Sequence, residues 1–192
     1  MQRKLKVLLA ISSILSVTSA IALTHSKRAT QLTQSPYSDQ LTSPIRGLSA
    51  QEVDNLLNGR GAGYARTAEL NSYPGPLHII ELQDQIEVSN EQLQQIEFVF
   101  QEMKAEAKAL GEDIVEREQE LSTAFASHQI NPSELQTQTQ RLAELYGKLR
   151  ATHLEAHLAV TPLLSPEQIA AYNNLRGYTG EKATHEHHHK HQ

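Results

Sequence analysis

The most regular feature of the chain is a hydrophobic repeat that begins after Ser89 and alternates spacings of three and four residues. It consists of Leu93, Ile96, Phe100, Met103, Ala107, Leu110 and Ile114. Such spacing places one apolar stripe along a helix and is typical of a helix packed against another helix. With a weaker continuation to Phe125, the repeat predicts a helix of roughly 35 to 40 residues, about 55 Å long at 1.5 Å per residue.

A second long amphipathic helix is predicted after a break at Asn131 and Pro132. We expect Ser133 to be its N-cap, with Gln136 three residues later. Its apolar stripe consists of Leu135, Leu142, Leu145, Leu149, Ala156, Val160 and Leu163. Because so short a loop joins them, the two long helices must pack antiparallel. The sequence therefore predicts an all-α fold centred on a long helical hairpin.

Short helices are predicted on both sides of the hairpin. Ser49 and Glu52 have the spacing of a capping box at the start of one helix, which the glycines at positions 59, 61 and 63 end. Helical spacing resumes over residues 64–70 and stops before a Tyr-Pro-Gly-Pro turn at 73–76. Ser165, followed by proline, starts a last helix that ends near residue 177. The helical domain thus spans residues 49–178.

The ends of the chain have a different character. Residues 1–22 have the layout of a secretory signal peptide, with basic residues at positions 3, 4 and 6 and an apolar run up to a small-residue cleavage site at Ala22. An uncleaved anchor is the alternative, but the run is short and rich in Ser and Thr for a spanning helix of about 20 apolar residues. We therefore expect a periplasmic protein without stable membrane insertion. Residues 23–48 are predicted to be a flexible leader, and residues 179–192 a disordered His-rich tail.

Composition narrows the classes of function. The absence of cysteine excludes disulfides and thiol chemistry. Removal of residues 1–22 takes away three of the 17 Lys and Arg and none of the 22 Asp and Glu, so the net charge falls from −5 to −8. This balance argues against nucleic acid as a partner. With three Phe and no Trp, a large core around a buried substrate pocket is hard to build, so we expect a helical surface and not an enzyme.

The histidine-rich tail is the first candidate metal site. His185, His187, His188, His189 and His191 place five imidazoles within seven residues. Neutral imidazole is a favoured ligand for divalent metal, zinc first, with nickel, cobalt or copper as alternatives. A plain polar tail, or an added expression tail, is the other interpretation.

Three further histidines are candidate ligands. His153 and His157 lie four residues apart on the second long helix, on one face, where they can share one ion. Pairing of the two arms predicts Glu106 in their neighbourhood. The alternative is that His153 packs at the helix–helix seam with His157 solvated beside it. His78, three residues before Glu81, is a third candidate, although such a histidine more often caps a turn.

Two short motifs begin helices at corresponding places. Residues 88–92 (Val-Ser-Asn-Glu-Gln) open the first long helix, and residues 164–168 (Leu-Ser-Pro-Glu-Gln) open the last short one. Each is a variant of Leu-Thr-x-x-Gln, and each combines a Ser N-cap with an acid in the first turn. Over residues 48–178, behind a signal peptide, the chain resembles the Spy/CpxP family of periplasmic stress proteins. Residues 68–78 are more similar to its heavy-metal-responsive and zinc-resistance-associated branch.

The resemblance implies a curved homodimeric cradle of helices and a role in envelope stress. In the metal-sensor branch a helical His-x-x-x-Met or similar pair joins ligands from an earlier helix, and His153 and His157 look like its counterpart; residues 49–58 contain no His. The leading hypothesis is a periplasmic envelope-stress protein that binds divalent heavy metal and holds unfolded clients without ATP. The alternative is a periplasmic metal sensor that acts on a membrane signalling partner.

Overall fold

The computed structural model describes residues 35–43 and 45–179. The predicted signal peptide, most of the predicted leader and the histidines of the tail lie outside these residues. The chain divides into two units, residues 1–43 and 44–192. In the first, the structure describes one short 3-10 helix, η1 (Ser38–Thr42). The second unit contains the long helices of the predicted hairpin.

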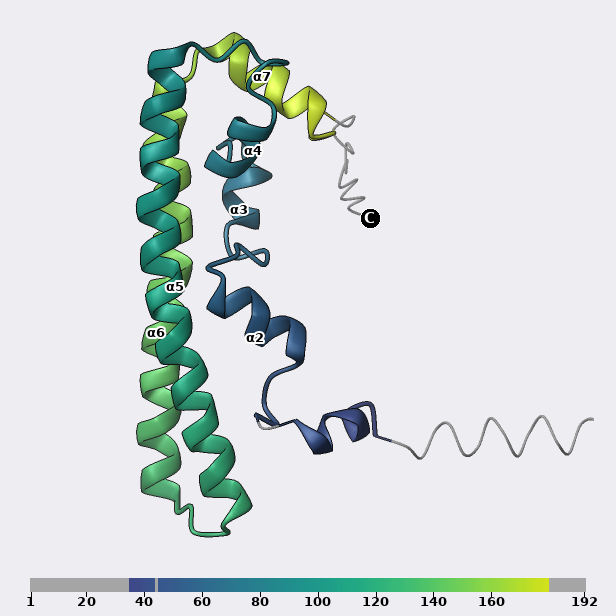
Figure 1. Ribbon diagram of the computed structural model, residues 1–192, viewed down its shortest axis with the longest axis vertical. Coiled ribbons are helices and arrows are strands. Elements are labelled where there is room, and N and C mark those ends of the chain that lie inside the picture. The colour runs from purple at the N-terminus through teal and green to yellow at the C-terminus, as the bar shows by residue number, and fades with distance from the viewer. Residues whose placement is uncertain (1–34, 44, 180–192) are drawn as a thin grey trace, which may run out of the picture. The chain divides into compact units, whose positions relative to one another are not determined.

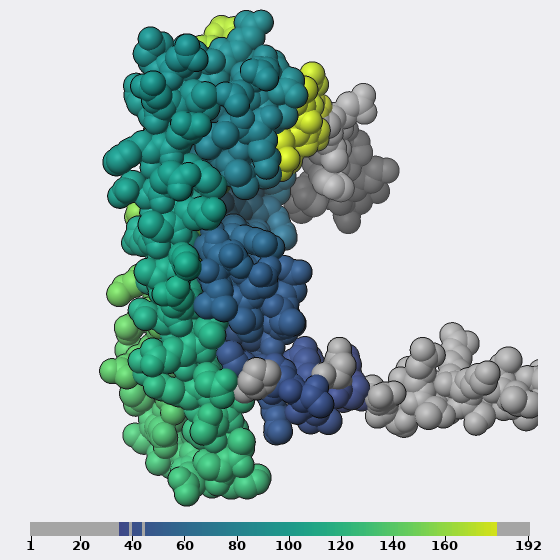
Figure 2. Space-filling view, viewed as in Figure 1, coloured from purple at the N-terminus to yellow at the C-terminus, as the bar shows by residue number. Residues whose placement is uncertain are grey.

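Within the described residues the fold is all-α, as predicted. Its helices are α2 (Ala50–Leu57), α3 (Arg66–Glu69), α4 (Pro76–Glu81), α5 (Asn90–Ala126), α6 (Pro132–Val160), the 3-10 helix η2 (Thr161–Leu163) and α7 (Pro166–Leu175), and no strand occurs in 35–43 or 45–179. The 37 residues of α5 and the 29 of α6 form the predicted antiparallel hairpin (Figure 1). Residues 45–81, here called the covering segment, carry α2, α3 and α4 along one side of the hairpin (Figure 2).

Serine capping boxes begin three of the helices, as the sequence indicated. Ser49, Ser89 and Ser165 each accept the backbone N–H of the residue three positions on at 3.2 Å, and that residue's side chain accepts the serine N–H in return. The predicted cap of α6 was wrong. Asn131, not Ser133, accepts the Glu134 N–H at 3.0 Å. Proline lacks an N–H and favours the first helical position, so the cap is the residue directly before it.

Two apolar clusters form the core. The first joins the covering segment to the middle of the hairpin through Ile45, Leu48, Leu56, Ala107, Ile114, Leu142 and Leu149. The second lies where α4 and α7 meet the hairpin and contains Ile79, Ile86, Ile96, Val160, Leu164 and Tyr172. Because Ile45 and Leu48 are buried, the packed domain begins at residue 45, earlier than predicted. Leu135 was wrongly placed in the apolar stripe and is 36% exposed.

Glycine allows α2 to pack on α5 with the backbones in contact. At Gly111 of α5, a Cβ atom would lie 2.6 Å from the carbonyl carbon of Leu56. At Gly59, which has a φ of +60°, it would lie 2.8 Å from the carbonyl oxygen of Lys104. Side chains at either position would push the covering segment off the hairpin.

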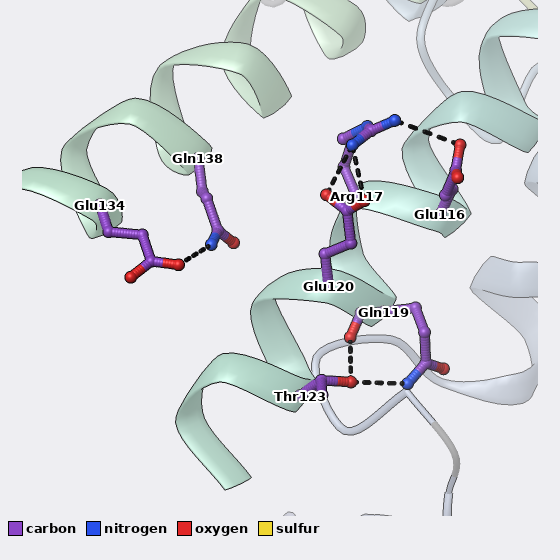
Figure 3. A network of polar contacts seen from close by, with 7 residues as sticks. All are labelled: Glu116, Arg117, Gln119, Glu120, Thr123, Glu134 and Gln138. Atoms are coloured by element: carbon purple, nitrogen blue, oxygen red, sulfur yellow. Dashed lines mark hydrogen bonds and ion pairs between the residues drawn. The ribbon is translucent and has the colours of Figure 1, made fainter. Parts of the chain in front are cut away.

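The part of the hairpin far from α7 is polar (Figure 3). Its contacts link side chains one turn apart, such as Arg117 with Glu120 at 2.6 Å and Glu134 with Gln138 at 3.2 Å. Exposed pairs of this kind add only a few tenths of a kcal/mol each. No residue from 115 to 141 is buried. Among the helices of the described ranges, none combines the length and the apolar character needed to cross a membrane.

Candidate functional site

A cavity of about 650 Å³ separates part of the covering segment from the hairpin. Its walls come from the turn after α2, from α3 and α4, from α5 around Met103, from α6 and from the residues after α7. His153, His157 and His78 all line it, so we call it the histidine cavity. The sequence predicted a helical surface without such a cleft. The difference arises because α3 and α4 lie against the hairpin and do not extend it.

His153 is held in the wall of the cavity by a stacked ring. Its side chain is 3% exposed, and its ring lies parallel to that of Tyr64, with centroids 5.8 Å apart and planes 8° apart. Burial, and secondarily the charge of nearby His157, lower the pKa of His153. The imidazole is therefore neutral near pH 7. Its Nε2 atom is buried and has no hydrogen-bond partner among the described residues.

His157 is also buried, at 6% exposure, so the interpretation that left it solvated was wrong. Its Nδ1 lies 2.8 Å from the carbonyl oxygen of Tyr73. A carbonyl can only accept, so Nδ1 carries a proton and donates it to this oxygen. Nε2 lies 3.2 Å from the point that a Cβ would occupy at Gly75. The covering segment thus both buries His157 and leaves one nitrogen of its ring available.

The acid beside the two histidines is Glu69 of α3. Glu69 Oε1 lies 2.8 Å from the same Cβ point at Gly75 that His157 approaches. The hydroxyl of Tyr172 donates to the Glu69 carboxylate, with its two oxygens at 2.9 and 3.1 Å, and accepts the Gly75 N–H at 3.3 Å. Burial raises the pKa of Tyr172 well above its usual value, so this hydroxyl stays protonated.

The expected position of Glu106 was wrong. It is exposed and does not line the cavity, where α5 contributes Phe100, Met103 and Lys104. The antiparallel pairing of α5 and α6 correctly predicted which stretch of α5 lies beside the histidines. Within that stretch, Glu106 lies on a side of the helix that does not line the cavity. Tyr64, Glu69 and Tyr172, which contact the histidines or position the acid, were missed. They come from three separate segments, and no local pattern in the sequence marks them.

The described residues offer an incomplete metal site. His153 and His157 provide two imidazoles, but no group of three or more His, Cys, Asp or Glu residues in the described ranges is arranged to hold an ion. Glu69 is already engaged by Tyr172. His78 lies on α4 with its Nδ1 2.8 Å from Glu81 Oε2. The five tail histidines lie outside the described residues.

A second, shallow hollow lies between α5 and α6 near the ends that adjoin α7. It has a volume of about 370 Å³ and is lined by Gln94, Gln95, Phe98, Val99, Ala159 and Leu163. We call it the Phe98 groove. Phe98, one of the lining residues, is 67% exposed. The groove is therefore an open apolar surface on the hairpin itself.

The two Leu-Thr-x-x-Gln variants meet in space. Beyond their capping bonds, the side-chain amides of Gln92 and Gln168 donate to each other at 2.9 and 3.0 Å. The second N–H of each amide reaches a backbone carbonyl, Leu163 O at 2.6 Å for Gln92 and Glu87 O at 2.9 Å for Gln168. The paired motifs thus join the start of α7 to the start of α5, a role that the sequence alone did not reveal.

Comparisons with protein-family models, with curated proteins and with solved structures find no match to this chain. The likeness to the Spy/CpxP family accordingly rests on the two motifs and their placement in the sequence.

Proposed function

We propose that this chain is an exported, non-enzymatic envelope-stress protein that holds unfolded polypeptide on the Phe98 groove without ATP. The observation that carries the proposal is the open apolar groove with Phe98 67% exposed at its edge. The resemblance of the capped motifs to those of Spy/CpxP proteins points in the same direction.

The shape of the groove suits loose binding of many sequences. A shallow hollow between two adjacent helices accepts apolar side chains without demanding one shape, whereas a specific small-molecule site encloses most of its ligand. An exposed apolar patch marks an interaction surface more often than a packing fault. The glutamines that flank the groove, Gln94 and Gln95, offer hydrogen bonds to an extended backbone.

A light-scattering assay tests the proposal. The chain from residue 23, at several-fold molar excess, should suppress aggregation of a heat-unfolded client, and Phe98→Ser should lose most of this effect. The matched control is Phe125→Ser, which removes an aromatic side chain that is 53% exposed but lies at the other end of α5. Equal effects of the two substitutions, or no suppression by the unmodified chain, would contradict the proposal.

A second copy of the chain is the competing occupant of the groove. The molar mass of the protein in solution, without client, shows whether a second copy occupies the groove. If Phe98→Ser converts a dimer into a monomer, the groove is a homodimer contact and the client must bind elsewhere. If the mass is the same for both proteins while the holding activity differs, the groove is the client surface.

Metal binding is the second candidate function, and five imidazoles within residues 185–191 favour it. Calorimetry with zinc distinguishes a sensor site at the histidine pair from sequestration by the tail. It compares the chain from residue 23 with the same chain ending at Gly180. Tight binding that survives the truncation at one ion per chain, and is lost in His153→Gln, supports a sensor site at the histidine pair. Binding that disappears with the tail leaves sequestration by the tail.

A further inference from the structure

The histidine cavity is more cationic than the chain as a whole. The protein has a net charge of −5, yet Arg66, Lys104 and Arg176 all line this cavity. Glu69 is the one acid among the lining residues, and the hydroxyl of Tyr172 already donates to it. Neither Arg66 nor Lys104 forms an ion pair within the described residues. The Lys104 ammonium lies 5.7 Å from the centre of the Phe100 ring. These charges are placed for an anion.

Two buried nitrogens in the same walls have no partner within the described part of the chain. They are Nε2 of His153 and Nε of Arg176. Another nitrogen of the Arg176 guanidinium, Nη2, donates to the Tyr178 hydroxyl at 3.3 Å. Buried polar atoms are rarely left unsatisfied, and each one calls for a water or a ligand atom. An oxygen acceptor in the cavity would satisfy the Arg176 N–H, and with the Nε2–H tautomer it would also satisfy His153.

Apolar side chains form another part of the cavity wall. Leu70 and Leu77 are 63% and 43% exposed, and Phe100 and Met103 of α5 are further lining residues. Arg60 also lines the cavity but is paired with Asp54 at 2.8 Å. A volume of about 650 Å³ falls within the range of small-molecule sites, which are mostly apolar with a few placed polar groups. The cavity thus combines an anion-binding part with an apolar part.

We propose that the histidine cavity binds a carboxylate carried on a short apolar body, either a free acid or the carboxyl-terminal residue of an apolar peptide. The planar guanidinium groups of Arg66 and Arg176 match a carboxylate. Glu69 in the same cavity opposes a second negative charge, which disfavours a phosphate dianion. The inference goes beyond holding of clients on the Phe98 groove, because the cavity and the groove share no lining residue.

Calorimetry in metal-free buffer tests the charge requirement, with octanoate and octan-1-ol as probes. Octanoate should bind one molecule per chain, and octan-1-ol should bind at least ten-fold more weakly. Arg66→Gln should weaken octanoate about ten-fold, the loss expected for one charge-assisted hydrogen bond. Arg141→Gln is the matched control, because Arg141 is exposed on α6 and does not line the cavity. Equal binding of octanoate and octan-1-ol, or an equal effect of the two substitutions, would overturn the proposal.

A peptide pair identifies the source of the carboxylate. A short apolar peptide is titrated with a free and with an amidated carboxyl terminus. Tighter binding of the free acid form than of octanoate supports a chain end as the ligand, and tighter binding of octanoate supports a small acid. If the amide and the free acid bind equally, the carboxylate assignment fails.

Cross-linking to the unsubstituted chain keeps the test independent of how the variants fold. An octanoate that carries a photoreactive diazirine at its far end should label Leu70, Leu77 or Met103, with the labelled residue located by fragment-ion sequencing. Excess octanoate should block this labelling. Labelling confined to Phe98 and Ala159 would place the molecule in the Phe98 groove and overturn the assignment to the cavity. This outcome leaves the aggregation assay unaffected, so the two proposals fail separately.

Discussion

Gly111 is the residue at which α2 crosses α5 with the two backbones in contact. A Cβ at this position would lie 2.6 Å from the carbonyl carbon of Leu56, and a backbone atom cannot turn away as a side chain can. We therefore expect Gly111→Ala to lower the free energy of unfolding by about 1–3 kcal/mol, the usual cost of overpacking, despite the better helix propensity of alanine. The measurement is urea unfolding followed by circular dichroism.

Gly147 provides the matched control for this substitution. It also lies inside a long helix, α6, but a Cβ there would meet no atom within 4 Å. Gly147→Ala should therefore raise the free energy of unfolding by about 0.8–1 kcal/mol through helix propensity alone. Opposite signs for the two variants support the packing argument. Stabilisation in both would show that α2 moves aside at little cost.

Single residues also show where prediction from sequence succeeds. Ser49, Ser89 and Ser165 were recognised as caps because a capping box is a local pattern. His153, a predicted metal ligand, is buried in the wall of the histidine cavity, where its ring stacks on Tyr64. Glu69 was missed because its place beside His157 depends on how the covering segment packs, which no spacing along the chain encodes. Contacts between segments far apart in the sequence are the part of the candidate site that the sequence does not specify.

At the level of elements, the reciprocal amide pair of Gln92 and Gln168 fixes α7 on the start of α5. Replacing either glutamine by leucine leaves the other amide with one unsatisfied N–H donor in a partly buried position, which typically costs about 1–3 kcal/mol. We expect Gln92→Leu and Gln168→Leu each to lower the free energy of unfolding by such an amount. The double variant should cost less than the sum of the two, with a coupling energy of about 0.5–3 kcal/mol.

A double-mutant cycle by urea unfolding measures this coupling. Gln101→Leu is the control for the change of side chain, since Gln101 is exposed on α5 and lies outside the contact between α5 and α7. It should change the free energy of unfolding by less than about 0.5 kcal/mol. Strictly additive losses at Gln92 and Gln168 would mean that each amide acts only as a helix cap.

The elements themselves were largely predictable. A repeat with spacings of three and four residues needs no knowledge of the partner helix, so α5 and the hairpin follow from the sequence alone. The start of α6 was misplaced because both Asn131 and Ser133 are good caps, and only the position of Pro132 distinguishes them. The short helix α3 was located approximately, but not the way that α3 and α4 lie along α5. That arrangement creates the histidine cavity, and it depends on contacts such as the one at Gly59.

In the hairpin unit as a whole, burial is uneven along the two long helices. Buried residues of α5 end at Ile114 and those of α6 begin at Leu142, while the large side chain of Phe125 between them is 53% exposed. Local opening costs little where few apolar contacts must be broken. We therefore expect amide hydrogens of residues 119–138 to exchange at least about ten-fold faster than those of 96–114 and 149–160, a difference of about 1.4 kcal/mol in opening free energy.

Hydrogen exchange followed by mass spectrometry measures this difference peptide by peptide. The comparison uses peptides within 119–126 of α5 and 132–138 of α6, and leaves out the loop between the two helices. Because fast and slow peptides then come from the same two helices, the contrast reports tertiary packing on the hairpin. The variant Gly111→Ala supplies an internal test. By pushing α2 off α5 it should raise exchange around Ile114 towards the rate of residues 119–138 and leave the second core cluster, around Ile96 and Val160, protected. Uniform protection along α5 would mean that the hairpin is held by its own seam and that the covering segment contributes little to it.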